Sequence, residues 1–216
     1  MDTATLPMDE WKTICWPQVE RAVFKLQKRI YQAALRNDKR NVQRLQRLSA
    51  SSWAARLLAV RRVAQDNAGK NTPGIDKIAR ISPEDKIQLA KQLKEIPVPQ
   101  PVRRVYIPKP GKTERRPLGI PVMQDRAAQA LVKQALEPEW EARFEPDSYG
   151  FRPGRGCHDA IQYIFEQIMH QPKYVLDADI SKCFDRIDHN ALLDKMDAAP
   201  RVRRMVRGWL KAGVME

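Results

Sequence analysis

A short acidic motif near the C-terminal end of the chain has the residue types that bind divalent metal ions. Residues 179–185 read Asp-Ile-Ser-Lys-Cys-Phe-Asp, with Asp177 just before them and Asp188 just after. Hard cations such as Mg²⁺ prefer carboxylate and carbonyl oxygens, and two-metal phosphoryl transfer uses acids to hold the ions against the reacting oxygens. The motif therefore predicts phosphoryl-transfer chemistry. The alternative, in which these acids only cap a strand and a turn, remains open.

The segments around this motif must position it. Residues 174–180 alternate weakly between apolar and polar side chains, so we expect a buried strand that presents carboxylates at its end. Helices are expected before it, at 158–169, and after it, at 191–211. The glycine-rich residues 149–156 predict a loop.

Upstream, the sequence predicts a hairpin with a basic tip. Residues 103–109 and 116–121 are β-prone runs on either side of a Pro-Gly turn. A helix is expected at 82–94, where Ser-Pro-Glu-Asp supplies an N-cap, a proline at the first position and acids in the first turn. Another helix is expected at 124–144, with Ala128, Leu131, Ala135 and Leu136 among its core candidates. Residues 67–76, which combine two glycines and a proline, predict a loop.

The N-terminal region predicts a basic helical arm. One side of a helical segment from 19 to 48 carries the apolar residues Val19, Val23, Leu26, Ile30, Ala34, Leu45 and Leu48. The opposite face carries Arg21, Lys25, Lys28, Arg29, Arg36, Lys39, Arg40 and Arg47, with no local neutralising partner. A run of serines and alanine at 49–52 then offers an N-cap to a second helix at 53–64. Contact with RNA or DNA and an ordinary solvated face are the two interpretations.

Composition supports a polyanionic partner. The chain of 216 residues has 39 Lys plus Arg against 26 Asp plus Glu, a formal net charge of +13. Cys15, Cys157 and Cys183 lack the spacing of a zinc site or a disulfide framework, so we expect reduced thiols. No apolar run approaches a membrane span and no signal peptide is recognisable, which predicts an intracellular protein of the cytoplasm, nucleoid or an organelle, with no membrane partner.

Several motifs taken together are more specific than any one of them. They are Ile-Pro-Lys at 107–109, Arg-Pro-Leu-Gly-Ile-Pro at 116–121, 124–129, Leu-Glu-Pro at 136–138, 148–156 and 179–185. In this order and spacing the chain resembles reverse transcriptases of the group II intron type, over residues 61 to 216. The loop at 69–76 resembles an extra N-terminal motif that such enzymes share with non-long-terminal-repeat retroelements. The resemblance implies an α/β (α+β) fold of fingers and partial palm, preceded by the basic arm.

The same resemblance implies roles for single residues. Asp179 would be the first catalytic aspartate and a ligand of Mg²⁺, with the backbone carbonyl of Ile180 as a second ligand. Phe184 would lie under the sugar and exclude ribonucleotides by steric clash, unless it is a core aromatic. Lys109 and Arg116 would contact the triphosphate of the incoming deoxynucleotide, unless they are solvated hairpin charges.

Other assignments keep their alternatives. Arg115 competes with Arg116 for the triphosphate, and only the residues that follow favour Arg116. Residues of the two loops would lie near template or primer, although a tight structural loop accounts for the glycine-rich one equally well; these residues are Lys70, Thr72, Gly74, Arg152 and Arg155.

We expect three domains: a basic RNA-binding arm at 1–65, fingers at 66–170, and the start of the palm at 171–216. No Tyr-Ala-Asp-Asp or Pro-Gln-Gly-Gly occurs in the sequence, so we expect a fragment of a longer enzyme that is inactive alone. The resemblance implies intron RNA, target DNA, an RNA template with primer and dNTP as partners, and assistance to splicing as a maturase. A non-catalytic RNA-binding maturase domain is the main alternative. A basic helix-turn-helix DNA binder would leave the motifs from 107 onward unexplained.

Overall fold

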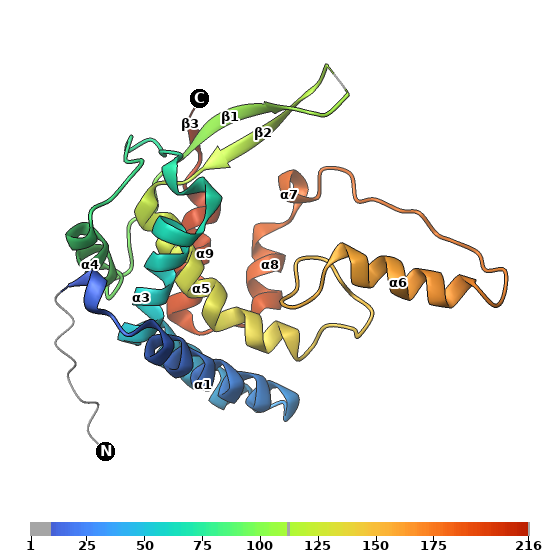
Figure 1. The fold of residues 1–216 in the computed structure, drawn as a ribbon, viewed down its shortest axis with the longest axis horizontal. Helices are drawn as coiled ribbons and strands as arrows, with labels where there is room; N and C mark the ends of the chain where they lie inside the picture. The colour runs from blue at the N-terminus through green and yellow to red at the C-terminus, as the bar shows by residue number, and fades with distance from the viewer. Residues whose placement is uncertain (1–9, 112, 216) are drawn as a thin grey trace.

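The computed structural model describes residues 10–111 and 113–215, and most of them form helices around one small sheet (Figure 1). The first nine residues of the predicted arm, Lys112 in the hairpin turn and Glu216 lie outside the described residues. The α-helices are α1 (Trp16–Leu35), α2 (Lys39–Ser51), α3 (Trp53–Arg61), α4 (Pro83–Gln92), α5 (Met123–Glu141), α6 (Cys157–Ile168), α7 (Cys183–Arg186), α8 (His189–Met196) and α9 (Pro200–Lys211). The strands are β1 (Val102–Pro108), β2 (Arg115–Ile120) and β3 (Val214–Met215), and Trp11–Thr13, Arg62–Asp66 and Ala68–Asn71 form short 3₁₀ or π turns. This combination confirms the α+β class.

The N-terminal arm contains α1 and α2 where the sequence predicted one helix, so that prediction was wrong. Asn37 has a φ of 54°, in the left-handed region that ends helices, and the Asp38 side chain then caps the first turn of α2. The break shifts α2 out of the helical register of α1. Leu45 is buried, but Leu48, expected on the same apolar side, is 47% exposed.

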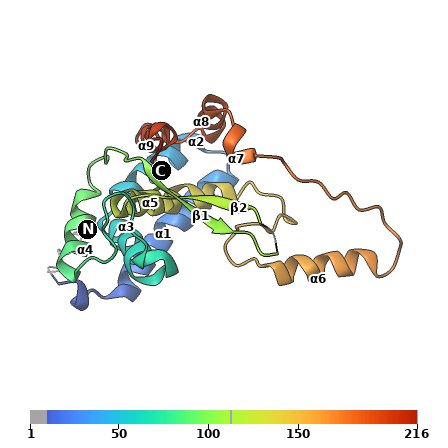
Figure 2. The ribbon, with the colours of Figure 1, turned by 90° about the horizontal axis from the view of Figure 1, so that it is seen from above.

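The main core lies where α5 packs against α1, α2 and α3. Seen from above, α5 runs through the middle of the molecule, with α1 and α3 on one side and α8 and α9 on the other (Figure 2). Ala128, Leu131 and Ala135 of α5 are buried as predicted, and Leu136 is partly buried. Because α5 touches so many elements, it fixes the positions of the segments at both of its ends.

Two predicted helix starts are confirmed by their caps. The hydroxyl of Ser52 accepts a hydrogen bond from Ala55 N–H at the start of α3. At α4, Ser82 and Asp85 form a reciprocal capping box, with Pro83 at the first helical position. Both signals are local in sequence, which is why they could be read without the fold.

The predicted basic hairpin is also confirmed. β1 and β2 pair antiparallel with Val105 opposite Leu118 and Ile107 opposite Arg116. Gly111 in the connecting turn has a φ of 69°, a conformation that glycine adopts without steric cost. The third strand, β3, pairs parallel with the other edge of β1, so the last described residues return to the sheet.

A buried polar cluster joins α2 to α5. The carboxylate of Glu139, 2% exposed, accepts a hydrogen bond from the Gln46 amide and pairs with Arg143 at 2.6 Å. Burial raises the pKa of Glu139 because the charged form is poorly solvated there. The backbone N–H of Ala199 donates to the same Gln46, so the cluster also holds the start of α9.

The second half of the chain departs from the core and returns to it. Helix α6 projects away from the other helices, and a long extended segment leads from its end to α7 (Figure 1). We predicted a buried strand at 174–180, and this prediction was wrong: Tyr174, Val175 and Leu176 are all more than four-fifths exposed and no strand forms. A strand needs a neighbouring strand for its N–H and C=O groups, and none of the described strands pairs with this segment.

The helical region expected at 191–211 is likewise divided in two. Asp197 has a φ of 42° at the end of α8, and Pro200 occupies the first position of α9. Proline favours helix starts because it has no N–H to leave unpaired there. The result is two antiparallel helices, α8 and α9, with a cavity between them.

Candidate functional site

The acidic motif lies on an exposed stretch that ends in the short helix α7. Asp179 and Ile180 are exposed, and the Phe184 ring is 92% exposed. Asp188 takes a structural role, because its carboxylate accepts a hydrogen bond from Ala191 N–H as the N-cap of α8. The motif therefore presents the Asp179 carboxylate, the Ile180 carbonyl and the Phe184 ring to solvent, and Asp177 and Asp185 are exposed as well.

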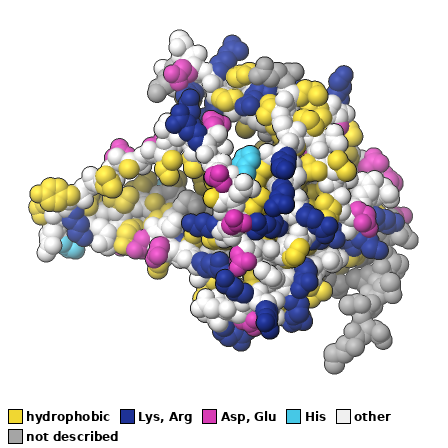
Figure 3. All heavy atoms as spheres, turned by 180° about the vertical axis from the view of Figure 1, so that it is seen from behind, with side chains coloured by type: hydrophobic (Ala, Val, Ile, Leu, Met, Phe, Trp, Pro, Cys, Tyr) yellow, Lys and Arg dark blue, Asp and Glu magenta, His cyan; other side chains and the backbone are white. Residues whose placement is uncertain are grey.

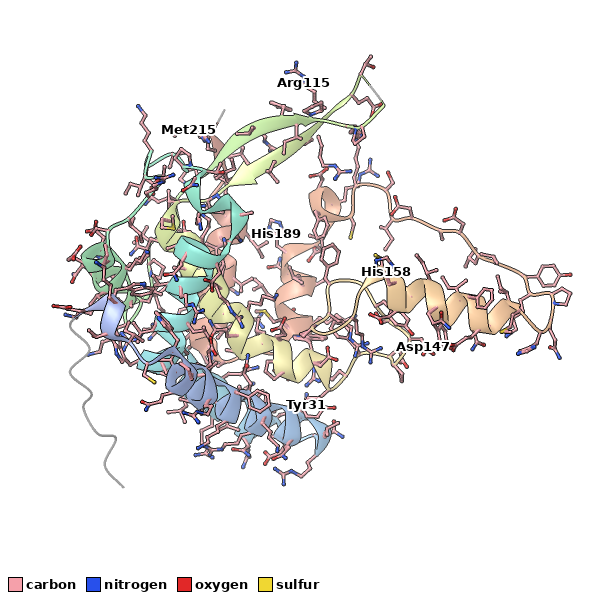
Figure 4. The ribbon with its side chains drawn as sticks, in the orientation of Figure 1. Tyr31, Arg115, Asp147, His158, His189 and Met215 are labelled. Carbon is pink, nitrogen blue, oxygen red and sulfur yellow. The ribbon has the colours of Figure 1, made fainter. Side chains whose placement is uncertain are left out.

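The hairpin places its cations on a projecting ribbon on the same side of the core as α6 and α7 (Figures 1 and 2). Lys109 pairs with Glu114 at 2.6 Å, and this hydrogen bond lowers the pKa of Glu114. Arg115 and Arg116 are exposed, and Figure 4 shows Arg115 at the outer side of the hairpin. Neighbouring residues of a strand point to opposite faces, so only one of these two arginines can face a given ligand.

The loop at 67–76 is fastened to the start of α5. The guanidinium of Arg126 donates to the carbonyls of Gly69 at 3.1 Å and Thr72 at 2.8 Å. Burial lowers the pKa of Arg126. Asp76 accepts a hydrogen bond from the backbone N–H of Met123. The loop is therefore held against the start of α5 by hydrogen bonds from both of its ends.

Two other loop residues have defined environments. A Cβ atom on Gly74 would lie 2.8 Å from backbone atoms of Val122 and 2.9 Å from the Pro121 carbonyl oxygen, so only glycine fits. The Lys70 ammonium donates to the Gln65 carbonyl at 2.7 Å. The loop needs Gly74 for close approach to the protein itself, before any approach to a ligand.

The glycine-rich loop owes its shape to Arg152. This residue is 7% exposed, and its guanidinium holds the Glu141 carboxylate at 2.7 and 3.1 Å while donating to the Glu145 and Ser148 carbonyls. The hydrogen bonds raise the pKa of Arg152 and lower that of Glu141. For Arg152 the structure thus favours the structural loop over a phosphate contact. Arg155 donates to the Pro146 carbonyl and remains partly accessible.

The basic arm keeps most of its charge free. Five cations of the predicted face are exposed and make no hydrogen bond or ion pair with other described residues: Lys25, Lys28, Arg29, Arg36 and Arg40. Arg47 donates to the Gln43 carbonyl one turn earlier. Lys39 pairs with Asp197 at 3.1 Å, a partner from outside the arm. That partner lies 158 residues away in sequence, beyond the reach of a local pattern.

Comparison with known families now decides the relationship. Residues 11–93 match the N-terminal domain of reverse transcriptase, and residues 107–215 match the family described as reverse transcriptase (RNA-dependent DNA polymerase). The chain belongs to the reverse transcriptase family. The first of these matches includes the basic arm, so the relationship extends further upstream than the residue 61 predicted from the motifs.

Several curated proteins are similar to this reverse transcriptase chain. "Protein YkfC" of Escherichia coli K12 is 34% identical over 182 residues, 79% of this chain and 47% of the relative. The "Group II intron-encoded protein LtrA" of Lactococcus lactis subsp. cremoris is 38% identical over 156 residues, 69% of this chain and 26% of LtrA. "Maturase-like protein 1" of Euglena gracilis is 27% identical over 210 residues, 94% of this chain and 46% of the relative. The chain therefore spans between about a quarter and a half of the length of these relatives.

The metal-binding capacity of this reverse transcriptase chain is partial. Within residues 10–111 and 113–215, no three His, Cys, Asp or Glu side chains lie close enough to hold a metal ion together. The oxygens of Asp179 and Ile180 are of the type that hard divalent cations prefer, so they fit such an ion in kind but not in number. Cys15, Cys157 and Cys183 are free thiols. No helix in the described part of the chain is long and apolar enough to cross a bilayer.

Proposed function

We propose that this chain is the N-terminal part of an RNA-directed DNA polymerase of the group II intron type. The observation that carries the proposal is the exposed Asp179 motif, on the same side of the core as the projecting hairpin, within a chain of the reverse transcriptase family. The whole protein would bind intron RNA, assist its splicing as a maturase, and prime reverse transcription at target DNA. It would act where that RNA resides, in the cytoplasm, the nucleoid or an organelle. The relatives named for group II introns and maturases support this.

The polymerase reaction assigns tasks to the residues of the motif and the hairpin. Asp179 and the Ile180 carbonyl would contribute ligands to Mg²⁺, which when bound would supply charge stabilisation for the triphosphate and the attacking 3′-oxygen. The exposed guanidinium of Arg116 can bind a phosphate through two of its N–H groups. Lys109 would release Glu114 and bind the triphosphate instead. Breaking the Lys109–Glu114 pair costs little free energy, because an exposed ion pair contributes little to stability.

The loop fastened by Arg126 supports a template contact. Lys70, Thr72 and Gly74 lie on a loop whose backbone is held rigidly against α5, and Arg155 lies on the glycine-rich loop. A preorganised loop of this kind binds a strand with less entropy loss than a mobile one. We accordingly assign residues 66–170 to the fingers, 171–216 to the start of the palm and 1–65 to the RNA-binding arm.

Phe184→Val tests the proposed selection of deoxynucleotides. Removing the ring opens space beside the 2′ carbon, so discrimination between dATP and ATP in kcat/KM is expected to fall about 10- to 200-fold, the range for a change of one or a few carbon groups in a pocket. The measurement is steady-state primer extension by a protein that contains the whole polymerase domain. Phe165→Val, a change at an exposed phenylalanine of α6, is the control. Equal discrimination in the two variants would assign Phe184 to packing.

Replacing Lys25, Lys28, Arg29 and Arg36 by Gln tests the RNA-binding arm. Each lost phosphate contact reduces the slope of log affinity against log salt by roughly 0.7 to 0.9, so about three is expected for four contacts. Intron RNA affinity is measured from about 50 to 200 mM salt. Lys39 is left unchanged because it already pairs with Asp197.

A charge-preserving control uses the same four positions. Exchanging Lys for Arg and Arg for Lys keeps the positive face and helix propensity, so RNA affinity and salt slope should stay near those of the original chain. If the Gln variant also keeps them, the arm is a solvated face and the intron contact lies elsewhere.

The alternative function is a non-catalytic RNA-binding maturase domain. It shares the RNA-binding arm and differs in having no polymerase reaction, so the arm experiment supports both functions. Nucleotide incorporation that depends on Asp179 separates them.

A further inference from the structure

Helix α9 uses two of its cations to hold its neighbours. Arg201 donates to the carbonyl of Leu93, just after α4, at 3.2 Å. Arg203 donates to the carbonyl of Leu193 in α8 at 2.7 Å and pairs with Asp194 of the same helix. These two arginines have structural tasks, and they explain only part of the charge of α9.

Three other cations of α9 have no such task. Arg204, Arg207 and Lys211 are exposed, and none makes a hydrogen bond or an ion pair with another described residue. Their spacing of three and four residues places them on one face of the helix. Like charges at this spacing repel one another, so an anion on this face would stabilise the helix that bears them.

This face borders a cavity between α8 and α9. The cavity has a volume of about 290 Å³ and is lined by His189, Asn190, Leu193, Arg207, Leu210 and Lys211. Figure 4 shows His189 at the N-terminal end of α8, on the side that faces α9. One water occupies about 30 Å³ in the liquid, so the cavity accommodates a phosphate group together with several waters.

We propose that the cavity between α8 and α9 binds a phosphate group of a polynucleotide strand, at a site separate from the basic arm. Arg207 offers a planar fork and Lys211 a point charge, while the Asn190 amide and the His189 ring offer further N–H donors. The acids adjacent in sequence to the lining residues are both engaged, Asp188 as the N-cap of α8 and Asp194 in its pair with Arg203, so the three free cations of α9 face no unpaired acid among these neighbours. This contact goes beyond the proposed function, because that function assigns RNA binding to the basic arm and no ligand to this cavity.

A strand fits this surface better than a free anion does. Arg204 continues the row beyond the cavity, and seven residues of α-helix separate it from Lys211, about 10 Å along the axis. Three nucleotides of a duplex strand rise by about the same distance, at 3.4 Å each. Figure 3, seen from behind, shows many Lys and Arg side chains across this face of the molecule, with fewer Asp and Glu side chains among them.

The position along the chain links this surface to the acidic motif. His189 follows Phe184 by five residues, so their Cα atoms lie at most about 17 Å apart. The cavity therefore begins within about 17 Å of Phe184, near the end of the acidic motif.

The test compares Arg207→Gln/Lys211→Gln with Lys91→Gln/Lys94→Gln in the whole chain. Both variants remove two positive charges from exposed residues, and the control pair lies at or just after α4 and does not line the cavity. The probes are a single-stranded RNA of about 20 nucleotides and a DNA of the same sequence, with affinity measured from about 50 to 200 mM salt. Loss of two contacts to a single strand should reduce the salt slope by about 1.4 and the control should reduce it less.

The outcomes of this comparison are distinct. Equal slopes in the two variants would overturn the proposal, because the loss would then reflect net charge alone. A reduced slope with both probes assigns the contact to the phosphodiester backbone, and a reduction with RNA alone assigns it to an RNA strand. Combined with the four Gln changes in the arm, the free-energy losses should add if the two sites are independent.

Asn190→Asp provides a second test that unfolding cannot mimic. It places a carboxylate in the wall of the cavity, and a negative charge in the first turn of α8 favours the helix. The variant should therefore keep or raise its unfolding temperature while its affinity for both probes falls several-fold. Unchanged or tighter binding would exclude the cavity as a phosphate site.

Discussion

DNA synthesis on an RNA template is expected to fall by about a thousandfold or more when Asp179 is replaced by Asn, in a protein that joins this chain to the rest of a polymerase domain. Asn has the same shape but lacks the charge that holds a divalent ion. Metal-ion charge stabilisation contributes several kcal/mol to such reactions, and each ~1.4 kcal/mol changes the rate tenfold. Primer extension under single-turnover conditions measures the effect.

The matched control is Asp188→Asn, nine residues further along. Asp188 caps α8, and Asn is an equally good N-cap, so the helix should form as before and activity should stay near that of the unchanged protein. Intron RNA affinity should be the same in both variants, because Asp179 is not a phosphate contact. Primer extension by Asp179→Asn at the unchanged rate would remove this residue from the catalytic centre.

The elements that the sequence predicted well are those with local signals. The capping box at Ser82 and the Pro-Gly turn of the hairpin each depend on residues only a few positions apart. The helical pattern of α5 likewise identified three of its buried residues, Ala128, Leu131 and Ala135, since a helix face repeats within four residues. These features could be derived because the interactions that form them lie within one element.

The secondary-structure predictions were wrong where a single residue or a partner distant in sequence determines the structure. Asn37 and Asp197 end helices by adopting positive φ, which the periodicity of the flanking residues does not reveal. Residues 174–180 have β-prone composition, yet a strand exists only when another strand accepts its hydrogen bonds. Val214–Met215 pairs with β1 instead, a partnership across more than 100 residues that the sequence did not indicate.

The predictions for the candidate site also differ in how the structure treats them. Motif order pointed to Asp179, Phe184 and Arg116, which the structure leaves exposed. It also pointed to Arg152, whose guanidinium is instead held by Glu141 within the fold. Composition cannot separate a phosphate-binding arginine from a structural one, because both need the same donors.

Asp125 and Arg126 entered the sequence analysis only as members of the motif at 124–129, and the structure shows that both have structural roles. Arg126 fastens the loop at 67–76, and Asp125 joins three elements. Asp125 is 1% exposed, and its carboxylate accepts hydrogen bonds from Gln100 N–H at 2.9 Å and from the Trp209 indole at 3.1 Å. It thereby ties α5 to the segment that enters β1 and to α9. Gly208 packs against Pro99 beside this contact, where a Cβ atom would lie 2.6 Å from the proline ring.

Asp125→Ala is expected to lower the free energy of unfolding by about 2 to 6 kcal/mol. A buried donor left without an acceptor costs roughly 1–3 kcal/mol, and the change strands two partly buried ones. Domains are typically stable by only about 5–15 kcal/mol. At about 2–4 °C per kcal/mol for a chain of this size, the unfolding temperature measured by circular dichroism should fall by about 4 to 24 °C.

Trp209→Phe distinguishes hydrogen bonding from packing in this effect. It removes the indole donor while keeping an aromatic ring against the core, so it leaves the bond to Gln100 intact and should cost less than Asp125→Ala. In the double variant the indole donor is no longer stranded, so the two losses should sum to more than the combined cost, by about 0.5–3 kcal/mol, as is typical for residues in contact. Strict additivity would show that Asp125 stabilises the fold through something other than the Trp209 bond. Because α9 carries Arg207 and Lys211, a loosened Asp125 contact should also weaken polynucleotide binding at the cavity beside α8, whereas Asp179→Asn should not.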